Sequence, residues 1–242
     1  MIIDLDEAMR YLGVKEDPDG EIRRAMAAAA HLLMQNITPR WVWRLYPLER
    51  GEAVQLGDTG IALTGRSAAK MLESCTNAAL LCVTLGAEFD GLMRATQVRD
   101  MARAAMLDAL GSAMVEAACD QAEMEISARL PGKHRTDRFS PGYGDLPVQL
   151  QPEIIRALDA QRRLGVTVTK SCMMIPQKTV TAIVGLSDSP QRARIRGCAY
   201  CAMNQTCELR KGGKRCDLCP SYHSDAGRSH GHGAAQARPQ AR

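Results

Sequence analysis

The chain has 242 residues, of which 45% are hydrophobic and only 4% aromatic, so we expect a core of aliphatic side chains in one large or two small domains. Its longest apolar run, residues 78–87, is too short to cross a bilayer, and the first residues lack the basic segment of a signal peptide. These features favour a soluble cytoplasmic protein.

The net charge of +4 is unevenly distributed along the chain. Residues 188–242 carry ten Lys and Arg against four Asp and Glu, whereas residues 1–187 carry 21 against 23. A nucleic-acid-binding body normally has a basic excess of its own. The body of this chain has none, so its basic character belongs to the C-terminal extension.

The first half of the chain mixes helical and extended patterns. Helices are expected over residues 5–12, 21–35 and 67–74, and residues 41–48 are rich in β-forming side chains. Residues 53–56 and 60–63, separated by Gly57-Asp58-Thr59, predict a hairpin. Residues 78–85 predict a buried strand that ends at Gly86.

The longest predicted helix covers residues 99–130, with Gly111 as its one weak point and Pro131-Gly132 at its end. A loop is expected over residues 131–151. The next helix is expected over 152–164, because Pro152 stands in its first turn and Gly165 follows its end. Two β-rich runs, 166–170 and 179–186, are joined through residues 173–176.

The loop contains the octapeptide Arg138-Phe-Ser-Pro-Gly-Tyr-Gly-Asp145. A guanidinium is a planar fork of donors that matches a carboxylate. Gly142 and Gly144 can adopt positive φ, which lets a ligand approach the main chain. This composition suits a small ligand with an amino-acid part, although Pro-Gly followed by Gly-Asp is also an ordinary turn signal.

The octapeptide does not stand alone. Together with residues 72–90, residues 107–117 and the stretch 169–187, which contains Met174-Ile-Pro176, it resembles the activation (S-adenosylmethionine-binding) domain of cobalamin-dependent methionine synthase, especially its stand-alone members. The resemblance covers roughly residues 60–190. It implies an α+β fold, with an antiparallel β-sheet flanked by helices.

The resemblance also implies roles for residues of the octapeptide. Arg138 would pair with the carboxylate of S-adenosylmethionine, Gly142 would give access to the backbone, and Tyr143 would offer a ring face and a hydroxyl. Pro141 and Gly144 would shape the turn. Glu116, on the long helix, would face the ligand's ammonium or ribose hydroxyls.

Each of these assignments has an alternative that depends on the residue alone. Glu116 on a helix is by default solvated or paired with a neighbouring cation. Arg138 could pair with Asp137 or Asp145 on the surface, and Tyr143 could be a packed turn aromatic. The larger enzymes of the family also have an aromatic in the last strand, where this sequence has Ala182-Ile-Val-Gly185.

The family's reaction is the reductive methylation of a corrinoid that has become inactive. The resemblance therefore implies S-adenosylmethionine as a ligand, a cobalamin carried by a partner, and flavodoxin or a ferredoxin-like protein as electron donor. The modules that bind homocysteine, folate and cobalamin are missing from this sequence. The chain is therefore expected to contribute to methionine synthase, a methyltransferase, in trans and not to be sufficient alone.

Five cysteines are concentrated near the C-terminus, at Cys198, Cys201, Cys207, Cys216 and Cys219. Two CxxC pairs supply the thiolates of a zinc site or an iron–sulfur cluster. A cluster would pass an electron to the corrinoid, whereas zinc would only stabilise the extension. The other four, Cys75, Cys82, Cys119 and Cys172, lie singly in apolar segments, as small buried side chains do.

We therefore expect an activation-like domain over residues 1–187, a cysteine-rich metal-binding extension over 188–220 and a disordered basic tail over 221–242. The alternative function is a non-catalytic, zinc-stapled binding module whose basic tail contacts nucleic acid or a partner protein.

Overall fold

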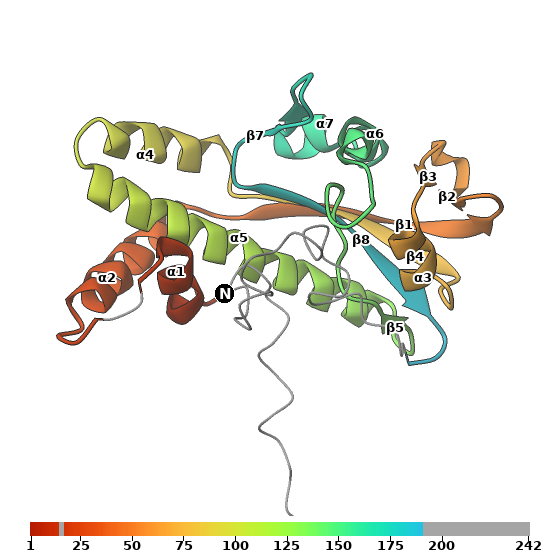
Figure 1. Ribbon diagram of the computed structural model, residues 1–242, viewed down its shortest axis with the longest axis horizontal. Helices are drawn as coiled ribbons and strands as arrows, with labels where there is room; N and C mark the ends of the chain where they lie inside the picture. The colour runs from red at the N-terminus through yellow and green to blue at the C-terminus, as the bar shows by residue number, and fades with distance from the viewer. Residues whose placement is uncertain (15–16, 191–242) are drawn as a thin grey trace, which may run out of the picture.

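The computed structural model describes residues 1–14 and 17–190. Within them, the centre of the molecule is a six-stranded antiparallel sheet in the order β3-β2-β1-β4-β8-β5 (Figure 1). Its strands are β1 (Arg40–Arg50), β2 (Val54–Leu56), β3 (Ala62–Leu63), β4 (Asn77–Thr84), β5 (His134–Arg135) and β8 (Thr179–Ser187). Helices lie on both sides of the sheet, so the predicted α+β class is confirmed.

The two central strands, β4 and β8, pair along their whole lengths. Asn77 lies opposite Leu186 at one end, and Thr84 lies opposite Thr179 at the other. Every residue of β4 after Asn77 is buried, because both faces of the sheet are covered. This explains why both strands are apolar runs without alternation, and the strands predicted at 78–85 and 179–186 are confirmed to within a residue.

On one side of the sheet, α5 (Met101–Arg129) packs against the strands, and α1 (Leu5–Leu12), α2 (Glu21–Asn36) and α4 (Ala87–Gln97) pack against α5 (Figure 1). The α5 helix begins where the Asp100 carboxylate accepts a 2.9 Å hydrogen bond from the Arg103 amide. In the middle of α5, a Cβ at Gly111 would lie 2.3 Å from the Phe89 ring of α4. The absence of a side chain at Gly111 therefore leaves room for the Phe89 ring, and the prediction that Gly111 only weakens α5 misses this role.

The other face carries α3 (Arg66–Met71), α6 (Gln151–Ala157) and α7 (Ala160–Leu164), with a small hairpin of β6 (Thr167–Val168) and β7 (Met174–Ile175). The single helix predicted over 152–164 is wrong, since Asp159 has a φ of 53° and separates α6 from α7. The bend brings Leu158, Ala160 and Leu164 into one core, at 0%, 0% and 4% exposure. Burial of these side chains outweighs the helical propensity of the segment.

Other boundaries differ in smaller ways. The hairpin predicted over 53–63 is confirmed by the pairing of Gln55 with Ala62, across a 3-10 turn at Gly57–Thr59. The 131–151 loop also contains β5 and a 3-10 turn at Val148–Leu150, and α4 is an additional helix. Among the described helices, none combines the length and the apolar composition needed to cross a membrane.

Candidate functional site

The octapeptide crosses the outer edge of β8. The Phe139 amide donates to the Ile183 carbonyl at 2.9 Å, and the Ile183 amide donates back at 2.8 Å. Phe139 is buried with Ile183 in the core beneath α6, whereas the preceding side chain, that of Arg138, contacts α5 on the opposite face. The segment therefore connects the two layers of the fold at the sheet edge.

The turn itself has the backbone that its glycines predict. Gly142 and Gly144 have φ values of 91° and 60°, in the region that favours glycine. The Gly142 amide donates to the Leu146 carbonyl at 2.8 Å and closes the loop. Pro141 is buried beneath it. Tyr143 is 38% exposed, and its ring packs edge-on against Phe139 with 5.8 Å between centroids.

Asp145 fastens the end of the loop to the start of α3. Its carboxylate accepts hydrogen bonds of 2.7 Å from the Arg66 amide and 3.1 Å from the Ser67 amide. Partial burial raises the pKa of Asp145, but the hydrogen bonds from Ser67 and Arg66 outweigh it and lower the pKa below its usual value. A Cβ at Gly65 would lie 2.7 Å from this carboxylate, so the contact depends on glycine there.

Arg138 is held by carboxylates of α5. Nη1 donates at 2.6 Å to both Asp120 and Glu123, and Nη2 donates to Glu116. Arg135 forms a second ion pair with Glu123. The three acidic residues are four and three positions apart, which places them on one face of the helix. Asp145 binds α3 instead, so it is not the surface partner considered for Arg138.

The electrostatics of this group favour cations. Two arginines face three carboxylates, which leaves a net charge of −1. Burial alone would lower the pKa of Arg138, but Glu116 and Asp120 outweigh it and raise the pKa above its ordinary value. The guanidinium has five N–H donors, of which three are used. Nε and one N–H of Nη2 make no hydrogen bond to a described residue.

The structure thus brings Arg138 and Glu116 into contact, with Pro141, Gly142, Tyr143 and Gly144 in the adjoining turn. Three residues of the group were missed from the sequence: Asp120, Glu123 and Arg135. The sequence does contain a sign of this group, because Asp120 and Glu123 share a helix face with Glu116 and the two arginines, 135 and 138, are only three residues apart. Val184, at the position of the missing aromatic, is fully buried.

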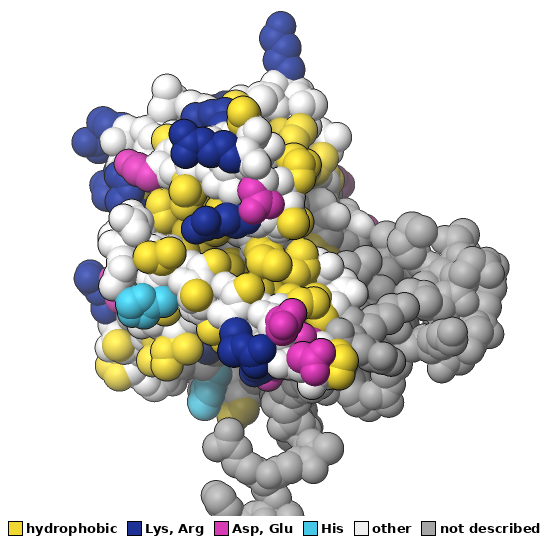
Figure 2. All heavy atoms as spheres, turned by 90° about the vertical axis from the view of Figure 1, so that its left-hand side faces the viewer, with side chains coloured by type: hydrophobic (Ala, Val, Ile, Leu, Met, Phe, Trp, Pro, Cys, Tyr) yellow, Lys and Arg dark blue, Asp and Glu magenta, His cyan; other side chains and the backbone are white. Residues whose placement is uncertain are grey.

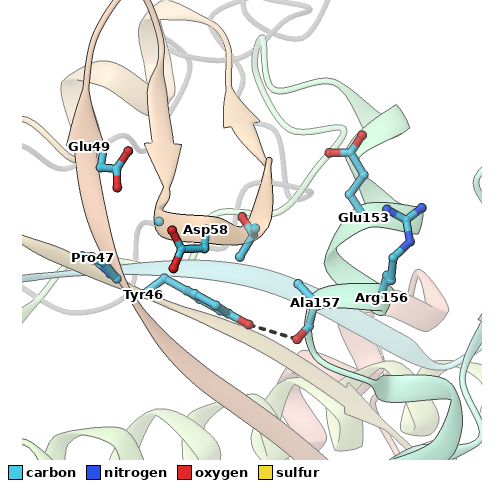
Figure 3. A pocket seen from close by; sticks show the side chains of 9 residues that line it. Tyr46, Pro47, Glu49, Asp58, Glu153, Arg156 and Ala157 are labelled. Carbon is cyan, nitrogen blue, oxygen red and sulfur yellow. Dashed lines mark hydrogen bonds between the residues drawn. The ribbon is translucent and has the colours of Figure 1, made fainter.

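A hollow of about 450 Å³ lies away from this site, on the α6 face of the sheet. Tyr46 forms its floor and donates a 2.9 Å hydrogen bond to the Ala157 carbonyl, while Asp58, Glu153 and Arg156 stand around it (Figure 3). The side chains of the octapeptide do not line it. The hollow is therefore separate from the Arg138 group.

Three of the four cysteines predicted to be buried are buried, namely Cys75, Cys82 and Cys119. Burial raises the thiol pKa of Cys75 to about 11 and those of Cys82 and Cys119 to about 12, so these three are protonated near neutral pH. Cys172 is half-buried. The five cysteines from 198 to 219 lie outside the described residues. Within residues 1–14 and 17–190, no group of three or more His, Cys, Asp or Glu is placed to hold a metal ion.

Comparison with known proteins gives a result at the level of fold. No family model matches the chain, and a search of curated proteins finds no significant match. Thirteen chains of solved structures do match. One is the crystal structure of the MetH reactivation domain bound to AdoHcy, with a TM-score of 0.60, 15% sequence identity and coverage of 87% of this chain and 83% of that one. The chain therefore has the fold of the MetH reactivation domain, as its sequence motifs led us to expect.

Proposed function

We propose that this chain binds S-adenosylmethionine and acts as a reactivation module, which supports reductive methylation of a corrinoid carried by a methionine synthase or related methyltransferase in trans. The domain that shares its fold was crystallised with AdoHcy, the compound that S-adenosylmethionine becomes after losing its methyl group. The observation that carries the proposal is the contact between Arg138 and Glu116 at the sheet edge, which presents opposite charges beside the glycine turn.

The charges of the ligand suit those of the group. S-adenosylmethionine carries a carboxylate, an ammonium and a sulfonium, with a net charge of +1, and the Arg138 group has a net charge of −1. The two remaining N–H donors of Arg138 can receive the carboxylate. Glu116 is 34% exposed and can receive the ammonium. Loss of the methyl group removes the sulfonium charge, so the group favours the methyl donor over its product.

The turn supplies the rest of the contact. Gly142 is exposed and has no side chain to keep a ligand away from its backbone. The exposed part of the Tyr143 ring offers an apolar surface for the ligand. Because Asp145 and Phe139 anchor the two ends of the turn, these groups are in place before a ligand arrives.

The chain's task in the reaction is positioning. The sulfonium supplies the methyl group, the partner supplies the cobalt that accepts it, and an electron donor restores the cobalt's reactive state. Binding of the amino-acid part by Arg138 and Glu116 would hold the sulfonium in a fixed orientation for the partner. Partner and donor are therefore both required for turnover.

Isothermal titration calorimetry with S-adenosylmethionine tests the proposal. The variants Glu116→Gln and Tyr143→Ala are expected to fold, since both side chains are partly exposed. Loss of a charged hydrogen bond at Glu116 should weaken binding by roughly 10- to 100-fold. Arg138→Lys keeps the charge for the α5 carboxylates but loses the planar fork, and it should weaken binding similarly.

Glu153→Gln, at the hollow on the other face, is the matched control and should bind as the wild type does. Thermal unfolding of each variant separates lost binding from lost structure. Absence of binding by the wild type would defeat the proposal. If all variants bound S-adenosylmethionine as tightly as the wild type, Arg138 and Glu116 would not be ligand-binding residues.

We further propose the division into residues 1–187, 188–220 and 221–242, with zinc or an iron–sulfur cluster held by the five cysteines from 198 to 219, and a cytoplasmic location. Metal analysis and visible absorbance of anaerobically purified protein distinguish the two centres. The rival function, a binding module with a basic tail, predicts polyanion affinity that falls steeply with salt and is lost on deleting residues 188–242.

A further inference from the structure

The turn between α4 and α5 exposes apolar side chains at one end of the molecule. We call residues 91–107 the α4–α5 tip. Val98 is 89% exposed, Met101 69% and Leu92 37%. Figure 2 views this end of the molecule, where apolar and basic side chains lie next to one another. An exposed apolar patch that is surrounded by charged side chains is typical of an interaction site.

The cations of the tip have no partners within the described part of the chain. Arg94, Arg99 and Arg103 are exposed, and the ion pairs among described residues include none of them. The acidic residue of the tip, Asp100, is occupied in capping α5. Three arginines against one aspartate give the tip a charge of +2, although residues 1–187 as a whole carry −2.

We propose that the α4–α5 tip is the docking surface for the corrinoid-carrying partner. The matching surface of the partner would have carboxylates around a small apolar centre. This inference rests on the proposed function, because a corrinoid delivered in trans must be recognised by a surface of this chain. Arginine forks pair with carboxylates, and exposed Met adapts to irregular apolar surfaces.

The tip and the Arg138 group are linked by one helix. Met101 and Glu116 are 15 residues apart on α5, which corresponds to about 22 Å along the axis and about 60° around it. A domain of 100 residues is roughly 30 Å across. One partner domain can therefore rest on the tip and still present its corrinoid to a ligand at Glu116.

The composition of the tip favours a protein partner over a lipid surface. Residues 91–107 contain no Trp, Tyr, Phe or Lys. Helices that lie on membranes use such aromatic side chains as anchors. A small convex tip also buries little area, as in complexes that form and dissociate quickly. Fast dissociation suits a module that is needed only when the corrinoid has become inactive.

The test uses the full chain and, as probe, the purified cobalamin-binding module of a methionine synthase, with affinity measured by biolayer interferometry at low and physiological salt. The wild type should bind, more weakly at higher salt. Arg99→Gln/Arg103→Gln should weaken binding about three- to tenfold, and Val98→Asp should weaken it by like-charge repulsion. Arg156→Gln/Lys170→Gln removes two exposed cations elsewhere and should leave binding unchanged.

The outcomes separate this inference from the proposed function. Failure of the wild type to bind the probe, or equal binding by the tip variants and the wild type, would overturn the docking surface. The docking surface would also be overturned if the tip variants bound the probe as the wild type does but lost binding to phosphatidylserine vesicles. S-adenosylmethionine affinity of the same samples, which the tip variants should retain, reports on the proposed function independently.

Discussion

Replacement of Gly111 by Ala is expected to destabilise the protein, although Ala is the better helix former by about 1 kcal/mol. The new Cβ would lie 2.3 Å from Cζ and 2.7 Å from Cε2 of Phe89. Phe89 is only 1% exposed, so its ring cannot turn into solvent. Overpacking of a core costs roughly 1–3 kcal/mol, and with so close a contact the upper value applies. The net loss is then about 2 kcal/mol, or roughly 4–8 °C in Tm for a protein of this size.

Urea unfolding followed by far-UV circular dichroism measures this difference. Gly91→Ala is the matched control, because Gly91 also lies inside a helix but its Cβ would meet only Arg94 Nη2, at 4.0 Å. Gly91→Ala should therefore stabilise the protein by about 0.5–1 kcal/mol. The double variant Gly111→Ala/Phe89→Leu should recover part of the loss. A Gly111→Ala protein as stable as the wild type would refute the reasoning.

Three further predictions concern titrating groups. Asp145→Ala should lower the free energy of unfolding by about 1 kcal/mol, because the amides at the start of α3 lose their acceptor. Since the pKa of Asp145 is lowered in the native state, this difference between wild type and variant should be complete above the pKa of the unfolded chain and should disappear as the pH falls through the native pKa. Urea unfolding between pH 7 and 2 measures it. Iodoacetamide at pH 8 should modify Cys172 in the native state, but the buried thiols only after unfolding. The free energy of unfolding should fall above pH 9, because the buried thiols then ionise only in the unfolded chain. The buried thiols are Cys75, Cys82 and Cys119. Hydrogen bonds from Trp41 and Trp43 lower the pKa of Glu125, so the fluorescence of these two tryptophans should stay constant through the pH range in which an ordinary glutamate titrates. Glu125→Ala should alter the fluorescence at every pH.

Much of the fold could be predicted because its elements carry strong local signals. The strands at β4 and β8 are apolar runs, and Pro131-Gly132 marks the end of the long helix α5. The break at Asp159 could not be predicted in this way, because nothing in its own segment disfavours a helix. The break follows from burial of Leu158 and Ala160, which depends on the rest of the core.

The candidate site was accessible from sequence only in part. The positive φ of Gly142 and Gly144 follows from local backbone chemistry and is confirmed, whereas their contact with a ligand stays a prediction. The partners of Arg138 could not be found from the octapeptide, because Glu116 is 22 positions away and meets it only when the chain crosses the sheet edge. Pairing across such a distance is set by topology.

The crossing of the octapeptide from one face of the sheet to the other has a mechanical consequence. Arg138 is fixed to α5, the adjacent Phe139 is fixed in the opposite core, and the backbone between them is bonded to β8. The segment therefore holds the two helical layers together at the edge of the sheet. A ligand that stabilises this segment should slow amide hydrogen exchange in α5 and in α6 together, although these helices lie on opposite faces of the sheet.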